Sequence, residues 1–116
     1  MKLKRYARQG DVGIYLVEGE LPEHLNFVKK ESEILAVGEH HGAKHELVKT
    51  SKDVELWVAV DKDLSYLKVI GGEAKIIHHG GTGARHDTIT LEPEKVYVRK
   101  IQVEYDPVVY RKNVVD

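Results

Sequence analysis

The sequence predicts an all-β protein, a small antiparallel barrel or sandwich of about seven to nine strands with little helix. β-Branched residues dominate its apolar set, with 16 valines and 7 isoleucines, and such side chains favour the pleated surface of a sheet. Short apolar runs recur roughly every ten residues with turn residues between them, as in sandwiches and small barrels. No window of about 11 or more residues shows the apolar period of an amphipathic helix. We therefore expect under about 15% helix.

The predicted strands follow the apolar runs in chain order. They cover residues 12–17, 34–37, 45–49, 54–60, 64–70, 74–78, 87–91 and 96–105. Residues 21–27 are predicted to turn, with at most one turn of helix. In the last strand the apolar positions change parity near Arg99, which predicts a bulge or a crossing between two sheets at that residue.

The strand at residues 54–60 has the most regular alternation of the chain. Strict alternation is typical of a strand that buries one face, and the apolar face here comprises Val54, Leu56, Val58 and Val60. Trp57, the one tryptophan, lies on the opposite face. We expect it to be substantially buried, because an exposed tryptophan within a strand promotes aggregation.

Charge and composition limit the function classes. The chain has 18 Lys and Arg against 19 Asp and Glu, a net charge of -1 and no cysteine. A disulfide scaffold, a thiolate zinc site and a cysteine nucleophile are therefore excluded, and nothing draws the chain as a whole to nucleic acid or to a membrane. The abundance of Lys and Glu over amides resembles the composition of thermophilic proteins.

No targeting or membrane-spanning segment is predicted. No apolar run approaches the roughly 18 residues that a membrane helix needs, and the basic arm at residues 1–10 lacks the apolar core of a signal peptide. The composition shows no break and no linker. We expect one domain over residues 1–116, located in the cytoplasm, that binds neither membrane nor nucleic acid.

Six of the seven histidines fall in two clusters. The clusters are His40, His41 and His45, and His78, His79 and His86. Neutral imidazole is the commonest metal ligand, and small cupin-like barrels gather histidines from several strands. This predicts a candidate site for a divalent transition metal at His45, His78 and His86. The favoured alternative is that these are surface or partner-contact histidines without a ligand and that the protein needs no cofactor.

Four short motifs resemble those of a small family of uncharacterised all-β proteins from bacteriophages and bacteria. The family pattern is a QGDV start, a GHxH centre, a histidine-containing LPxG segment and a QREY close. This chain has QGDV at residues 9–12, Gly38 followed by His45, His86 ahead of an I-x-L-x-P run, and Q-x-E-Y at residues 102–105.

The resemblance implies roles for some positions and shows two departures. It implies that His45 and His86 stand at the family's histidine positions and that the closing strand contains Gln102, Glu104 and Tyr105. Ala43 replaces the first histidine of GHxH, and Glu94-Lys95 replaces the turn glycine. The family carries no established activity, so the resemblance supports the fold more than any chemistry.

We expect a non-enzymatic accessory or structural protein, phage-related in origin, in the host cytoplasm or a virion. It would act through protein contacts and form a homo-oligomer, because exposed sheet edges favour pairing. The candidate contact residues are Val108, Val109 and Tyr110, which could instead form a last strand within the domain. The alternative function is a cupin-like metal-binding protein or metal-dependent enzyme that uses the histidine cluster.

Overall fold

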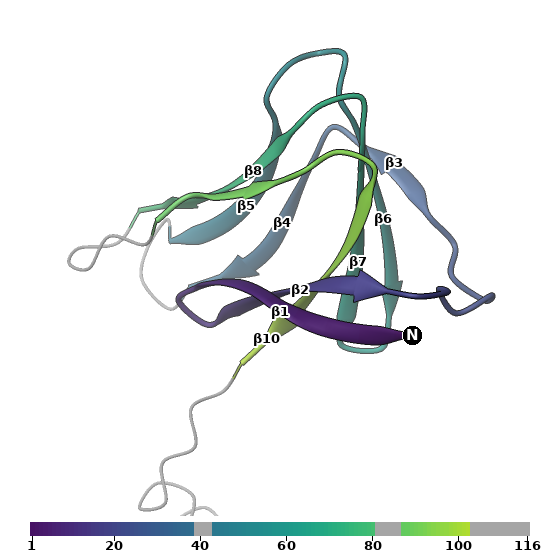
Figure 1. Ribbon diagram of the computed structural model, residues 1–116. Helices are drawn as coiled ribbons and strands as arrows, with labels where there is room; N and C mark the ends of the chain where they lie inside the picture. Colours follow the sequence, from purple (N-terminus) through teal and green to yellow (C-terminus); the bar gives the residue numbers. More distant parts are fainter. Residues whose placement is uncertain (39–42, 81–86, 103–116) are drawn as a thin grey trace, which may run out of the picture.

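The structure is a computed structural model that describes residues 1–38, 43–80 and 87–102. Within these residues the chain forms ten β-strands in two antiparallel sheets and no helix (Figure 1). The predicted all-β class is confirmed; the sheets form a sandwich and not a closed barrel, and the strands exceed the seven to nine expected. The strands are β1 (Lys2–Gln9), β2 (Val12–Glu18), β3 (Val28–Lys30), β4 (Ser32–Val37), β5 (Lys44–Lys49), β6 (Glu55–Asp61), β7 (Leu64–Ile70), β8 (Ala74–His79), β9 (Ile89–Leu91) and β10 (Lys95–Ile101).

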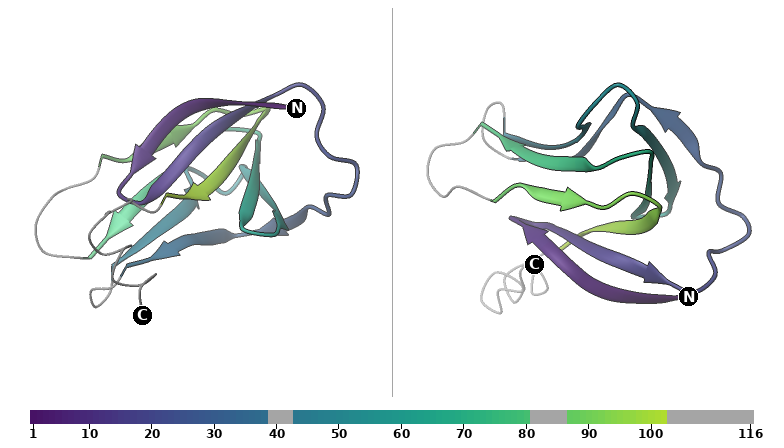
Figure 2. Two further views of the ribbon diagram at one scale, coloured as in Figure 1. Left: turned by 90° about the horizontal axis from the view of Figure 1, so that it is seen from below. Right: turned by 45° about the horizontal axis from the view of Figure 1, so that its top comes forward.

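The two sheets are connected at both sides. The larger sheet has the order β1-β2-β10-β7-β6-β3 and the smaller has the order β4-β5-β8-β9. Only Glu31 separates β3 from β4, so the chain passes directly from one sheet to the other. On the far side, the Tyr6 hydroxyl of β1 donates a hydrogen bond of 2.6 Å to the Thr90 carbonyl of β9. Figure 2 shows β5 and β8 in one layer and β1 and β2 in the other.

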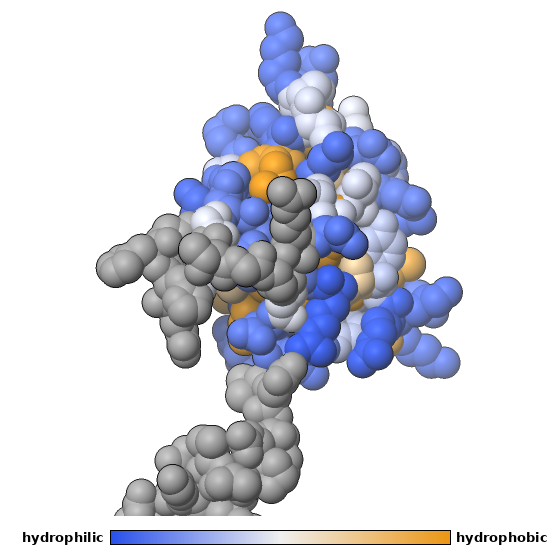
Figure 3. Space-filling model, turned by 90° about the vertical axis from the view of Figure 1, so that its left-hand side faces the viewer, coloured by the Kyte–Doolittle hydropathy of each residue, from blue (hydrophilic) through white to orange (hydrophobic). Residues whose placement is uncertain are grey.

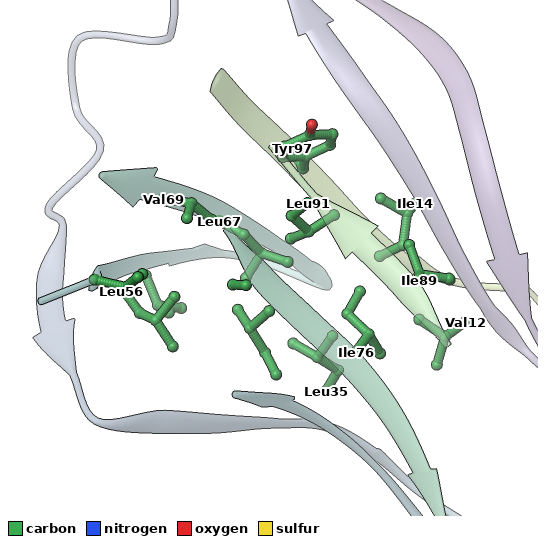
Figure 4. Packing of buried hydrophobic residues seen from close by; sticks show 14 residues of the cluster. Val12, Ile14, Leu35, Leu56, Leu67, Val69, Ile76, Ile89, Leu91 and Tyr97 are labelled. Atoms are coloured by element: carbon green, nitrogen blue, oxygen red, sulfur yellow. The ribbon is translucent and has the colours of Figure 1, made fainter. Parts of the chain in front are cut away.

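The main hydrophobic core lies between the two sheets (Figure 4). Both sheets supply it through their inward-facing residues, including Val12, Ile14 and Leu67 from the larger sheet and Leu35 and Ile76 from the smaller. Each of these side chains is at least 96% buried. Burial of such apolar surface is the dominant favourable term in folding.

A second apolar cluster covers the outer face of the larger sheet. Ala59, Tyr66 and Val98 form its buried part. Segment 19–27, which joins β2 to β3, packs against them with Leu21, Leu25 and Phe27 among its contacts. The larger sheet is therefore apolar on both faces around β6, β7 and β10.

This double burial explains the parity change in β10 and corrects the bulge or crossing predicted at Arg99. The register of β10 with β2 runs without a shift across Arg99, and its register with β7 runs without a shift as far as Arg99. Tyr97 faces the inter-sheet core, whereas Val98 belongs to the outer cluster. Apolar residues therefore occur at both parities of one regular strand, and Arg99, two residues after Tyr97, lies on the inward face.

Other local predictions were wrong at surface positions. The segment predicted as a basic arm is strand β1. Its side chains are mostly exposed, so its apolar and polar residues do not alternate and the sequence shows no sign of a strand. Val60 is 68% exposed because it lies near the end of β6, past Val58, the last residue that β3 pairs. By contrast, the turn predicted at residues 21–27 is present: the Leu25 N–H donates a hydrogen bond to the Pro22 carbonyl, and the segment contains no helix.

Trp57 is half-buried on the outer face of β6, so it is covered less completely than expected. Its cross-strand neighbours are Lys29 on β3 and Lys68 on β7, and its indole N–H donates to Glu55 Oε1 at 3.0 Å. The aliphatic stems of lysines can cover an aromatic ring while their charged ends stay in water. No described residue belongs to a helix that could cross a membrane.

Candidate functional site

One end of the sandwich brings together segments that are far apart in the sequence. Gly10 and Asp11 make the tight turn between β1 and β2, with Gly10 at a φ of +57°. The Gln102 amide after β10 donates a 2.7 Å hydrogen bond to the Asp11 carbonyl. The Gly38 amide donates a 2.8 Å bond to the Ala43 carbonyl, which joins the end of β4 to the start of β5. The opening motif of the chain therefore lies beside Gln102 of the closing motif.

Gln9 is the buried polar centre of this end, with 1% of its surface exposed. Its Nε2 donates hydrogen bonds to the carbonyls of Ile76 at 3.0 Å and Asp87 at 2.9 Å. These two acceptors fix the orientation of the amide, so Oε1 accepts a 2.7 Å bond from Nδ1 of His45. A neutral His45 ring therefore has its proton on Nδ1 and its lone pair on Nε2.

The structure brings together two of the three histidines predicted as metal ligands. His45 of β5 and His78 of β8 are direct cross-strand partners, and their ring centroids lie 4.6 Å apart with an angle of 43° between the planes. His86, the third, lies outside the described residues. Within residues 1–38, 43–80 and 87–102, no three His, Cys, Asp or Glu side chains are grouped as metal ligands would be.

A cleft of about 290 Å³ opens beside this buried centre. Its lining comprises Asp11, Leu35, Ala36, Val37, Gly38, His45, Arg99 and Ile101. Four consecutive residues, from the end of β4 through Gly38, contribute to it, although successive side chains of a strand point to opposite faces. The cleft therefore lies along the edge of β4, with β10 forming its opposite wall.

Arg99 is the one cationic Lys or Arg side chain in this lining. Its Nη2 donates a 2.6 Å hydrogen bond to the buried hydroxyl of Ser65. Its Nε is buried and has no hydrogen-bond acceptor among the described residues. None of the ion pairs among those residues includes Arg99, so the site contains a half-buried guanidinium with unused donor capacity.

Burial and nearby carboxylates have opposite effects on the pKa of the Arg99 guanidinium. Burial lowers the pKa of the guanidinium below its ordinary value, because removal of water disfavours the charged form. The carboxylates of Asp63 and Glu33 act in the opposite direction through space. Arginine remains protonated under such a shift, so the cleft presents a partly desolvated positive charge.

Sequence reasoning missed the two central polar residues of this site. Gln9 occurs in the opening motif, but nothing in the sequence indicates that β1 ends inside the molecule. Arg99 could have been found from the parity of Tyr97, Arg99 and Ile101, read as one inward face. The predicted contacts Val108, Val109 and Tyr110 lie outside the described residues.

These features define the class of protein: a two-sheet antiparallel β-sandwich with a small cleft at one end, in which an arginine lies among mostly apolar residues. The chain belongs to the family described as a domain of unknown function (DUF8820), whose pattern matches residues 8–102. This match confirms that the chain is a member of a family without an assigned function, as the motifs suggested. No curated protein and no solved structure matches the chain.

Proposed function

We propose that this protein is a non-enzymatic interaction protein that self-associates through the outer edge of β4. The observation that carries this proposal is the composition of that edge. Ser32–Val37 contains a single charged residue, Glu33, and two exposed aliphatic side chains, Ile34 at 42% and Val37 at 78%. An edge strand with few charges and with exposed apolar side chains is a template for pairing with another chain.

The other sheet edges of the described residues are better protected. β1 carries four basic residues, Lys2, Lys4, Arg5 and Arg8, and like charges disfavour the pairing of two copies. β3 and β9 have three residues each, and the Tyr6–Thr90 hydrogen bond ties β9 to β1. β4 is therefore the edge at which a second copy would meet the least repulsion.

A two-fold axis beside β4 would pair this strand with its copy in an antiparallel ladder. The smaller sheets of two protomers would then join into one continuous sheet, a self-complementary arrangement typical of dimers. The side of the molecule in Figure 3 is largely hydrophilic, with small separate hydrophobic patches. Edge pairing suits such a surface better than contact between broad apolar faces does.

The test compares two lysine substitutions at exposed aliphatic residues. Ile34→Lys places a charge within β4, opposite Glu46 of β5, and should weaken self-association by at least about tenfold. Val60→Lys, at a 68% exposed position of β6, is the matched control and should leave association unchanged. Equal association of both variants and the unsubstituted chain, measured by sedimentation equilibrium, would contradict the β4 interface.

The segment containing Val108, Val109 and Tyr110 remains a proposed contributor to partner contacts. Removing the residues after Asp106 should weaken association if the segment belongs to the interface. A truncated chain that instead loses cooperative unfolding would show that the segment is an internal strand. Full association of a stably folded truncated chain would exclude it from the interface.

We further propose a phage-related origin and a location in the host cytoplasm or in a virion. The motifs at residues 9–12 and 102–105 support this proposal, because they resemble those of bacteriophage and bacterial proteins. Recovery of the protein from the secreted or periplasmic fraction of its source cells, instead of the cytoplasm or virions, would contradict this location.

A second candidate function, metal binding by His45, His78 and His86, is favoured by one observation. Gln9 accepts from Nδ1 of His45, and a hydrogen bond of this kind orients a ligating histidine and presents its other nitrogen. Protein purified without a histidine tag should then contain stoichiometric metal, which His78→Ala should remove and His24→Ala should not. Untagged protein that neither contains nor binds zinc, nickel or manganese would exclude this function.

A further inference from the structure

The direction of Arg99 is set by the regular alternation of β10. The cross-strand partners of Arg99 are Ile14 on one side and Ser65 on the other, and Ile14 belongs to the inter-sheet core. The guanidinium is therefore placed at the end of that core, in the wall of the cleft. A charged group in such a position is expensive unless it is paired and hydrogen-bonded.

The described residues provide hydrogen-bond acceptors for only part of the Arg99 guanidinium. Ser65 Oγ, a neutral acceptor, takes one donor at 2.6 Å, while the buried Nε has no acceptor. The fork of a guanidinium matches the two oxygens of a carboxylate, which can accept two parallel N–H bonds. A carboxylate that entered the cleft would supply a charged hydrogen-bond acceptor, which the more distant carboxylates of Asp63 and Glu33 do not provide.

The other residues that line the cleft indicate which chemical group a bound carboxylate ligand would carry. Leu35, Ala36, Val37 and Ile101 are apolar walls, which suit an aliphatic chain. A volume of about 290 Å³ lies at the lower end of the range for small-molecule sites, roughly 300–1,000 Å³. The cleft therefore fits a short aliphatic acid better than a nucleotide or a sugar phosphate.

The charges of the lining favour a monoanion over a dianion. Arg99 is the one Lys or Arg side chain of this lining, which also contains the acidic residue Asp11. The carboxylates of Asp63 and Glu33 act on the guanidinium through space. A dianionic phosphate would meet only one cation, and its second charge would lack compensation. A monocarboxylate requires only the single cation that the cleft provides.

We propose that this cleft binds a small aliphatic monocarboxylate, with the Arg99 guanidinium holding the carboxylate and the residues from Leu35 to Val37, with Ile101, enclosing the chain. The site goes beyond the proposed self-association; because the cleft lies along the same edge of β4, pairing of two copies would compete with binding. The binding measurement is made on both the unsubstituted chain and the Ile34→Lys variant, whose substitution lies outside the cleft lining. A failure of the β4 interface would therefore leave this test intact.

The test titrates butyrate into the full-length protein and follows amide chemical shifts by NMR. Saturable shifts are expected at the amides of Ala36, Val37 and Ile101. Arg99→Gln, which keeps a polar side chain but removes the charge, should weaken binding by about tenfold or more. Arg5→Gln, at an exposed arginine of β1 outside this cleft, should leave the binding of butyrate unchanged.

A second variant keeps Arg99, so the proposal can still be tested if Arg99→Gln does not fold. Val37→Asp adds a negative charge at a 78% exposed position of the lining and should also weaken butyrate binding, whereas Val60→Asp, at a 68% exposed position outside it, should not. Butanol and inorganic phosphate should bind more weakly than butyrate. Butyrate that does not bind, that binds equally to Val37→Asp, or that binds no better than butanol or phosphate would overturn the proposal.

Discussion

The side-chain oxygen of Gln9 accepts a 2.7 Å hydrogen bond from Nδ1 of His45, and both residues are more than 90% buried. This contact joins the end of β1 in the larger sheet to β5 in the smaller sheet. Because Gln9 also donates to the carbonyls of Ile76 and Asp87, one amide links four segments. Buried polar groups that are fully hydrogen-bonded specify a unique arrangement, whereas unpaired ones are destabilising.

Gln9→Leu should therefore destabilise the protein strongly. The substitution keeps a side chain of similar bulk but leaves two carbonyls and His45 Nδ1 without their partner, so the free energy of unfolding should fall by about 2–4 kcal/mol. Urea denaturation measures it. Gln102→Leu, which removes one side-chain bond to the Tyr15 hydroxyl at a partly exposed site, should cost about 1 kcal/mol. Equal losses in the two variants would contradict the central position of Gln9.

The same contact predicts the tautomer of His45. With Nδ1 donating to Gln9, the neutral ring should be protonated at Nδ1, which long-range proton–nitrogen NMR correlation detects directly. His24, whose Nε2 lies 3.0 Å from Asp61 Oδ2, provides an exposed comparison in the same spectrum. A neutral His45 protonated mainly at Nε2 would show that the Gln9 amide has the opposite orientation.

Replacing Glu94 with glycine should stabilise the folded protein. Glu94 adopts a φ of +63° between β9 and β10, in the Glu94-Lys95 pair that stands in place of the turn glycine of the resembling family. Left-handed backbone costs a residue with a Cβ roughly 1–2 kcal/mol, part of which glycine loses again to unfolded-state entropy. Glu94→Gly should raise the free energy of unfolding by up to about 1 kcal/mol. Glu92→Gly, at negative φ in the same turn, should lower it; the reverse order would contradict this backbone.

Tyr97 predicts a loss of stability at alkaline pH. Burial raises the pKa of its phenol to about 12, above the ordinary value of roughly 10. The folded state therefore favours the protonated phenol, and this contribution is complete below about pH 10 and disappears as the pH rises toward 12. Ultraviolet titration should show one tyrosine ionising last, and Tyr97→Phe should remove both that late step and its share of the alkaline destabilisation. A Tyr97→Phe variant with the same late step would contradict the assignment.

The elements that the sequence predicted best are those with one buried face or two apolar faces. β7 was predicted at its observed bounds, and β6 within one residue at each end. β1 and β3 were missed because their side chains are largely exposed, so packing imposes no alternation on them. A strand shows a recognisable pattern of apolar residues where its side chains are buried, and the side chains of edge strands are buried little.

The site was harder to predict because it depends on contacts between distant segments. The pairing of His45 with His78 follows from the register of β5 against β8, and the Gln9–His45 bond follows from how the two sheets meet. Neither is encoded in sequence spacing. Arg99 was misread because apolar residues on both faces of β10 looked like a change of parity, which only the outer cluster around Val98 explains.

The most direct test of the proposed function is the solution mass of the full-length chain. Sedimentation equilibrium at tens of micromolar should give twice the 13.2 kDa of one chain, and the mass should fall toward that of a monomer on dilution. Ile34→Lys should sediment as a monomer at the same concentrations, while Val60→Lys should not differ from the unsubstituted chain. A strict 13.2 kDa monomer at every concentration would contradict self-association through β4.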